Sequence, residues 1–200
     1  AAAEADLAVR LASDGLFLCS ALCLSVGMVG SMTLVYGIAE EKEKHTLRTL
    51  MLANVSAEQL MLAKGFVAFV LTIATELVCF AVSGAPWSLA GWYLLLGSVG
   101  AVPVILVSLV VGLASRDQMT AGLYSVPVLL LTMAPIFGSF SEGIRAVVCF
   151  APTGGADELL RLIVSGSLTP AAAVAPLAVT AVWMVAAVVV FKLLYRRLLR

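Results

Sequence analysis

Glu76 is the ionisable residue that lies deepest inside an apolar stretch of this sequence, with Thr72 and Thr75 close before it. A charge at the centre of a bilayer costs at least about 2.5 kcal/mol, so such residues usually face a cavity or a partner. We therefore consider Glu76 a candidate for contact with a proton or a cation. The alternatives are a carboxyl nearer the interface and a protonated carboxyl hydrogen-bonded within the protein.

The other reactive side chains do not form a recognisable site. His45 is the one histidine, and no further ligand lies at metal spacing from it, so we expect a helical surface residue there. Cys19 and Cys23 stand four residues apart in an apolar run, where cysteine behaves as a small hydrophobe. We therefore expect no metal site, no disulfide framework and no catalytic residue on this chain.

The composition shows which solvent must surround these residues. Of 200 residues, 62% are hydrophobic and 12% are charged, and the formal net charge is zero. A soluble domain carries about 25% charged residues, so lipid must surround most of this chain. The balanced charge also argues against a nucleic-acid partner.

Five apolar runs are long enough to cross a bilayer as helices, which takes about 20 residues. They cover about residues 16–38, 60–82, 89–114, 119–137 and 171–191. Unbroken apolar runs exclude the alternating strands of a membrane barrel. The expected fold is an all-α, polytopic membrane bundle, with residues 1–15 ending an extracellular segment and residues 16–200 forming one transmembrane domain.

Region 138–170 contains two shorter helical runs, Ser141 to Phe150 and Ala156 to Val164. Neither can span a bilayer, but broken helices are tolerated at membrane depth where protein shelters them. We expect a re-entrant helix pair before the last span.

The basic residues predict the orientation. With a cytoplasmic C-terminus, nine lysines and arginines lie in inside segments, and only Arg10, Arg145 and Arg161 lie outside. This places the N-terminus outside.

The segment from Glu40 to Gly65 is too polar to enter lipid and has a helical pattern. Glu40 and Lys44 form a favourable i,i+4 pair, and Leu47, Leu50 and Met51 form a short apolar stripe. We expect an amphipathic helix at about residues 40–52. It could transmit force between a partner and two spans, or lie passively on the headgroups. Downstream, the spacing of Ser115 and Gln118 predicts a capping box at the start of the fourth span.

This segment resembles the permeases of the type-2 class of ABC exporters. The matching positions are Glu41, Glu43, Lys44, Thr46, Leu47, Leu50, Met51, Val55, Ser56, Glu58 and Lys64, and a proline of the family pattern is replaced by the local sequence Ala53-Asn54-Val55. The region before the last span is also similar to the re-entrant pair of that family. The family's first span and the outside segment after it have no counterpart in this sequence.

The resemblance implies a membrane subunit that pairs with a second permease copy or paralogue and docks on an ATP-binding subunit. ATP and Mg would bind that partner, because this sequence has no P-loop pattern. The residues expected to couple to the ATPase are Glu41, Glu43, Lys44, His45, Thr46, Leu47, Arg48 and Leu50. Glu76, Thr72 and Thr75 would then lie on the transport path.

The resemblance also implies a multi-pass protein of the plasma membrane, namely the bacterial inner membrane. Two other interpretations stay open from the residues alone. One is a secondary transporter, although no internal repeat is present. The other is a non-transporting, immunity-type membrane protein. The sequence does not identify the cargo.

Overall fold

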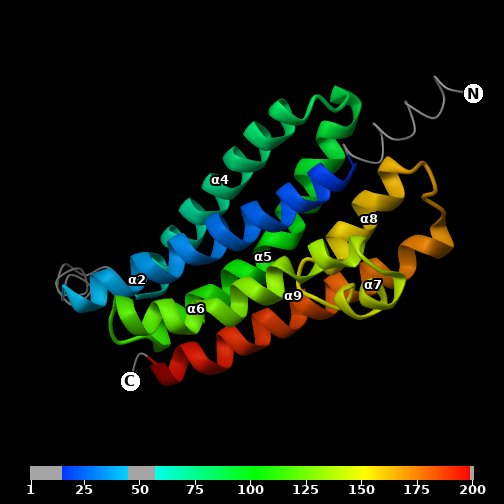
Figure 1. Ribbon diagram of the computed structural model, residues 1–200. Coiled ribbons are helices and arrows are strands. Elements are labelled where there is room, and N and C mark those ends of the chain that lie inside the picture. The colour runs from blue at the N-terminus through cyan, green and yellow to red at the C-terminus, as the bar shows by residue number, and fades with distance from the viewer. Residues whose placement is uncertain (1–14, 45–56, 199–200) are drawn as a thin grey trace, which may run out of the picture.

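The computed structural model describes residues 15–44 and 57–198 of the chain, and those residues form helices and short connections (Figure 1). The first long helix, Gly15–Glu43, contains a π-helix η1 (Ser25–Met32) followed by α2 (Thr33–Glu43). The elements that follow are α4 (Ala57–Ser83), η2 (Trp87–Leu89), α5 (Ala90–Ala114), α6 (Gln118–Met133), η3 (Ala134–Ser139), α7 (Glu142–Val148), α8 (Gly154–Val164) and α9 (Pro170–Leu198).

Five of these helices are long and apolar enough to cross a membrane, as the sequence predicts. They are Gly15–Glu43, Gln59–Ser83, Trp87–Ala114, Gln118–Ser139 and Pro170–Leu194. The all-α membrane fold is therefore confirmed. The observed helices extend past the predicted bounds, most of all at the end of the fifth span, where α9 continues to Leu198. At the end of the first span, the polar residues Glu40 to Glu43 also continue the same helix.

The first and third spans form the centre of the bundle. In their most apolar windows, 67% and 56% of the residues are buried, against 22%, 28% and 17% in the second, fourth and fifth spans. Small residues allow this packing. A side chain on Gly27 would meet Leu129 of α6, and one on Gly112 would meet Ile38 of α2. The small residues of the first span therefore serve packing within one chain.

The bundle has two ends. The basal end, as we call it, holds the end of α2, the α5–α6 connection and the C-terminus (Figure 1). The distal end holds the α4–α5 connection, α7 and the α8–α9 connection. Two distal turns need glycine, since Gly84 and Gly166 adopt φ values of +72° and +65°.

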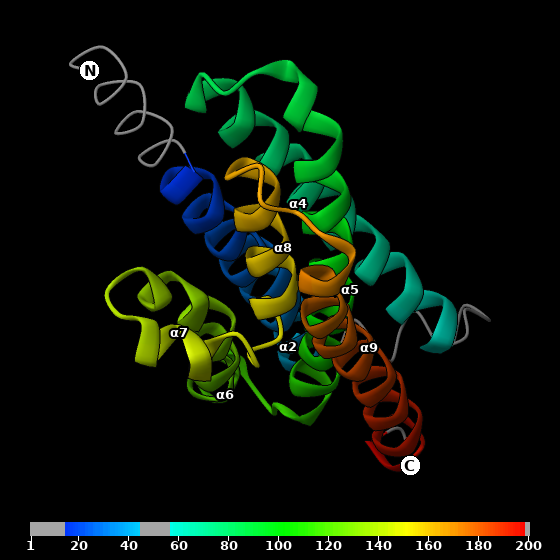
Figure 2. The same ribbon diagram turned by 90° about the vertical axis from the view of Figure 1, so that its right-hand side faces the viewer.

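The helices α7 and α8 occupy the region predicted to hold two short helices. Figure 2 shows α8 beside α5 and α9, with which it makes its main contacts. Its first turn is buried inside the bundle. Glycines make this approach possible, because a Cβ on Gly155 would lie 2.4 Å from the carbonyl oxygen of Pro176 in α9.

Candidate functional site

Glu76 is fully buried in α4, where its carboxyl group packs against α5. A Cβ atom on Gly97 of α5 would lie 2.2 Å from Glu76 Oε2, so the carboxyl fills the space that any side chain at position 97 would need. The glycine is therefore required for this helix contact.

The side chain of Ser25 in η1 lies near the carboxyl of Glu76. Among the described residues, neither oxygen of this carboxyl has a hydrogen-bond partner that meets normal geometry, and neither does the buried hydroxyl of Tyr93, one turn before Gly97 on α5. Burying a polar group without a partner is costly. A buried carboxyl without hydrogen-bond partners is therefore a candidate for a functional role rather than a packing role.

The structure places only one of the two threonines with Glu76. Thr72 lies one turn away on the same buried face, packs against Gly30 of the π-helix and donates a hydrogen bond to the Ala68 carbonyl. Thr75 is half-buried and donates to the Leu71 carbonyl. None of the four cavities described below has Glu76 or Thr72 in its lining.

The π-helix opposite this part of α4 was not foreseen. Short π segments occur often at functional sites. Ser31 in this segment receives a 2.9 Å hydrogen bond from Ser108 of α5. An apolar run that contains Gly, Ser and Met is compatible with an α-helix and with a π-helix. The sequence therefore does not predict the π-helix.

At the basal end, the acidic and basic residues of α2 bind other helices of the same chain. Glu41 forms a 2.9 Å ion pair with Lys64 of α4, and the Gln118 amide at the start of α6 donates to Glu43 Oε2. Lys42 donates to the carbonyl oxygens of Leu113 and Ser115 at the end of α5.

Lys44, by contrast, pairs with Glu40 on the exposed surface of α2. It is also the C-terminal cap of this helix. Of the other residues expected to couple to a partner, His45, Thr46, Leu47, Arg48 and Leu50 lie outside the described residues, as does most of the predicted amphipathic helix.

A small groove opens beside the Glu41–Lys64 pair. It has a volume of about 380 Å³ and lies between α2 and α4. A second, apolar gap of about 120 Å³ lies among α5, α6 and α9, next to Trp183. Both are lined mainly by apolar side chains.

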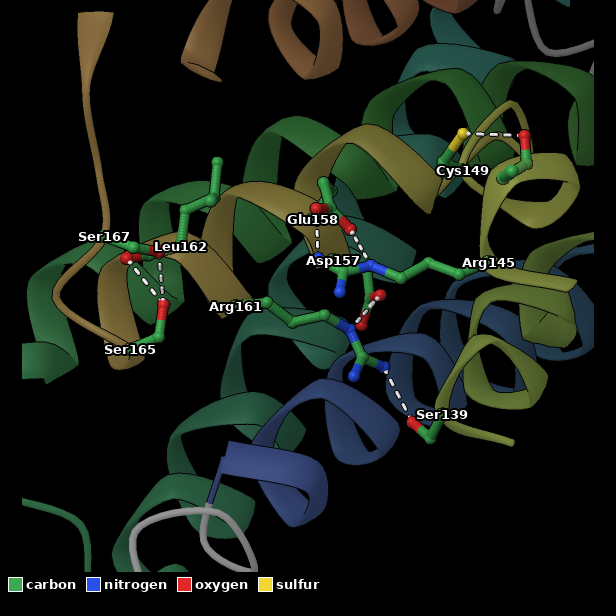
Figure 3. Close-up of polar contacts among 10 residues, drawn as sticks. Ser139, Arg145, Cys149, Asp157, Glu158, Arg161, Leu162, Ser165 and Ser167 are labelled. Atoms are coloured by element: carbon green, nitrogen blue, oxygen red, sulfur yellow. Dashed lines mark hydrogen bonds and ion pairs between the residues drawn. The ribbon is translucent and has the colours of Figure 1, made fainter. Parts of the chain in front are cut away.

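At the distal end, one ion pair joins α7 to α8 and a second ion pair lies within α8 (Figure 3). Arg145 of α7 binds both carboxylate oxygens of Glu158 in α8, and Arg161 binds Asp157 at 2.8 Å and Ser139 at 3.1 Å. Burial raises the pKa of the Asp157 carboxyl, and Arg161 only partly opposes this. The hydrogen bond and charge of Glu158 raise the pKa of Arg145.

The sequence alone did not predict that these four charged residues lie together. The available signal was the presence of charged residues within two short apolar runs, where an unpaired charge would be costly. A cavity of about 810 Å³ opens at this end beside Arg145, Arg161 and Ser139.

The start of α8 is fixed to three other elements. Thr153 donates a 2.6 Å hydrogen bond to the Thr132 carbonyl of α6, and the Cys23 thiol lies 3.8 Å from the same hydroxyl. Trp183 of α9 donates to the Phe150 carbonyl at 2.7 Å. Cys23 therefore lies among packed groups, as expected for a small hydrophobe. Within the described residues, no three metal-ligating side chains gather at one point.

Comparison with known protein families gives a match over most of the chain. The family model described as "ABC-2 family transporter protein" matches residues 13–194, nearly the whole chain. No curated protein and no solved structure matches it.

Proposed function

The chain belongs to the ABC-2 family of transporter proteins and is a multi-pass ABC transporter permease; from this premise we propose that it exports its substrate when a separate ATPase subunit closes on ATP. In this proposal, ATP and Mg bind the partner subunit, and a second permease copy or paralogue completes the membrane part. The main observation in support of this proposal is the family match over residues 13–194.

The basal end is the proposed docking surface for the ATPase. The end of α2, the start of α4, the α5–α6 connection and the end of α9 all lie there (Figure 1). The described basic residues also favour this end, which holds Lys42, Lys44, Lys64, Arg116 and Lys192, whereas the distal end holds Arg145 and Arg161. By the positive-inside rule, the basal end would be cytoplasmic. The protein would then reside in a plasma membrane, namely the bacterial inner membrane.

The contacts of α2 separate the coupling residues into two groups. Glu41 and Glu43 connect α2 to α4 and α6, so they would pass a displacement into the spans rather than touch the ATPase. Lys44, His45, Thr46, Leu47, Arg48 and Leu50 would form the contact with the ATPase itself.

Glu76 and Thr72 are proposed to take part in transport through movement of α4. They are buried between α4, α5 and the π-helix, so a substrate or a proton would reach them only when these helices separate. Thr75 lies away from the most buried face of α4 and is the weaker candidate.

Co-purification tests this function. The tagged protein is extracted from native membranes in mild detergent, and its partners are identified by mass spectrometry. Recovery of a P-loop ATPase in stoichiometric amount is the expected result. A well-folded preparation without an ATPase would instead favour a non-transporting, immunity-type protein on the same fold.

A further inference from the structure

A groove of about 420 Å³ lies between α7, α8 and α9 near the distal end. Most of its wall is apolar and includes Phe150, Leu162, Ala175, Pro176 and Val179. Its volume falls in the range of small-ligand sites, about 300–1,000 Å³. The groove has no role in the function proposed above.

The rim of the groove is charged. Glu142, Arg145 and Glu158 line it, and Glu142 and Arg145 also line the larger distal cavity. The pair between Arg145 and Glu158 uses two guanidinium N–H groups of the five that arginine carries. Further donors of Arg145, whose side chain is 43% exposed, are therefore available to a ligand at the rim.

The surroundings of the groove indicate contact with lipid. The groove borders α9, the span with the smallest buried share, and the neighbouring Val147 and Phe150 are 71% and 66% exposed. Side chains of this kind on a membrane protein face hydrocarbon. An apolar groove beneath a charged rim matches an amphiphile with one chain in the bilayer and its headgroup at the surface.

The charges at the rim select among headgroups. One guanidinium and two carboxylates line the groove, so an anionic headgroup would meet more repulsion than attraction. A headgroup with one phosphate and one ammonium would satisfy both signs. We propose that this groove binds a zwitterionic phospholipid, with its phosphate on Arg145, its ammonium between Glu142 and Glu158, and an acyl chain in the groove.

The groove is held in shape before any ligand binds. The Trp183–Phe150 hydrogen bond fixes α9 to the α7–α8 connection, and the contact of Gly155 with Pro176 fixes α9 to the first turn of α8. A preformed site loses less conformational freedom on binding. Lipid binding of this kind does not depend on the proposed ATP-driven export.

Native mass spectrometry of the purified protein, without an ATPase, tests the proposal. Equal amounts of phosphatidylethanolamine and phosphatidylglycerol are added, and retained lipids are counted. We expect the wild-type protein to retain phosphatidylethanolamine several-fold more than phosphatidylglycerol. Glu142→Gln should abolish this preference, because Glu142 is exposed and its loss leaves the Arg145–Glu158 pair intact.

Two tryptophan variants locate the binding. Val179→Trp fills the groove and should remove the retained lipid, whereas Val182→Trp, at an exposed position of α9 outside the groove lining, should not. Equal retention of both lipids, or retention unaffected by Val179→Trp, would overturn the proposal. A dimer that Val179→Trp dissociates would also overturn it, since a second copy would then cover the groove.

Discussion

The carboxyl group of Glu76 occupies the space beside Gly97 where a Cβ atom would otherwise lie, 2.2 Å from Oε2. This contact joins α4 to α5. The sequence indicated Glu76 as a candidate residue, but it did not indicate that Glu76 contacts Gly97. A buried carboxyl pressed against bare backbone has no room for a larger neighbour.

Gly97→Ala should therefore destabilise the protein, by about 1–3 kcal/mol as is common for overpacked sites. Thermal unfolding in detergent measures this. Gly91→Ala is the matched control, since Gly91 is on the same helix and a Cβ there would meet no atom within 4 Å. Equal stability of the two variants would show that the carboxyl moves aside without cost.

Glu76→Gln should keep the fold, because the two side chains have nearly the same shape, but should largely abolish transport. Complementation of a strain that lacks the transporter measures this, with the protein level in the membrane checked beside it. Thr75→Val is the comparison and should complement better than Glu76→Gln, since Thr75 is only half-buried and is the weaker candidate. Normal complementation by Glu76→Gln would remove Glu76 from the transport path.

The stability of the distal end should depend on pH through Asp157. Its folded-state pKa is raised by burial, so the folded state holds this proton more tightly than the unfolded chain, whose aspartates titrate near pH 4. The resulting stabilisation is present below about pH 4 and is lost as pH rises through the folded-state pKa.

Wild-type protein should therefore lose stability relative to Asp157→Asn as pH rises from about 4 to 7. Asp117→Asn is a control of opposite sign, because the amide of Thr120 lowers the pKa of Asp117. For this pair, the higher stability of wild type relative to Asp117→Asn should disappear as pH falls below about 4. Unfolding across this pH range checks both, and parallel pH profiles for wild type and Asp157→Asn would refute the first.

Reversing the Glu41–Lys64 pair should separate its internal role from contact with a partner. Glu41→Lys and Lys64→Glu should each weaken ATP hydrolysis by the assembled complex, and the double variant should restore it. The pair is partly exposed, so its contribution to stability should stay below about 1 kcal/mol. Failure of the double variant to recover would mean that Glu41 contacts the ATPase directly.

The sequence predicted the elements better than their contacts. Five spans could be found because apolar length follows directly from bilayer thickness. The predicted cap of α6 was wrong: Ser115 does not cap this helix but ends α5 and donates to the Val111 carbonyl, while Asp117 is the N-cap. Either polar residue can cap a helix, and local spacing does not decide between them.

The contacts at the distal end could not be predicted for a different reason. The pairing of Arg145 with Glu158 depends on how α7 and α8 fold back on each other. Likewise, nothing in the local pattern indicates that Glu41 meets Lys64 across the α2–α4 connection. Such contacts follow from tertiary packing, and they appear only once the helices are placed.

Site-specific photo-crosslinking in native membranes tests the ATP-driven permease most directly. A photoreactive residue is placed at position 46 or 48, in the segment proposed to contact the ATPase, and at position 143 on exposed α7 as a control. The account predicts adducts with a P-loop ATPase from positions 46 and 48, changed in yield by ATP, and none from position 143. Adducts with an ATPase from position 143, or from none of the three, would contradict it.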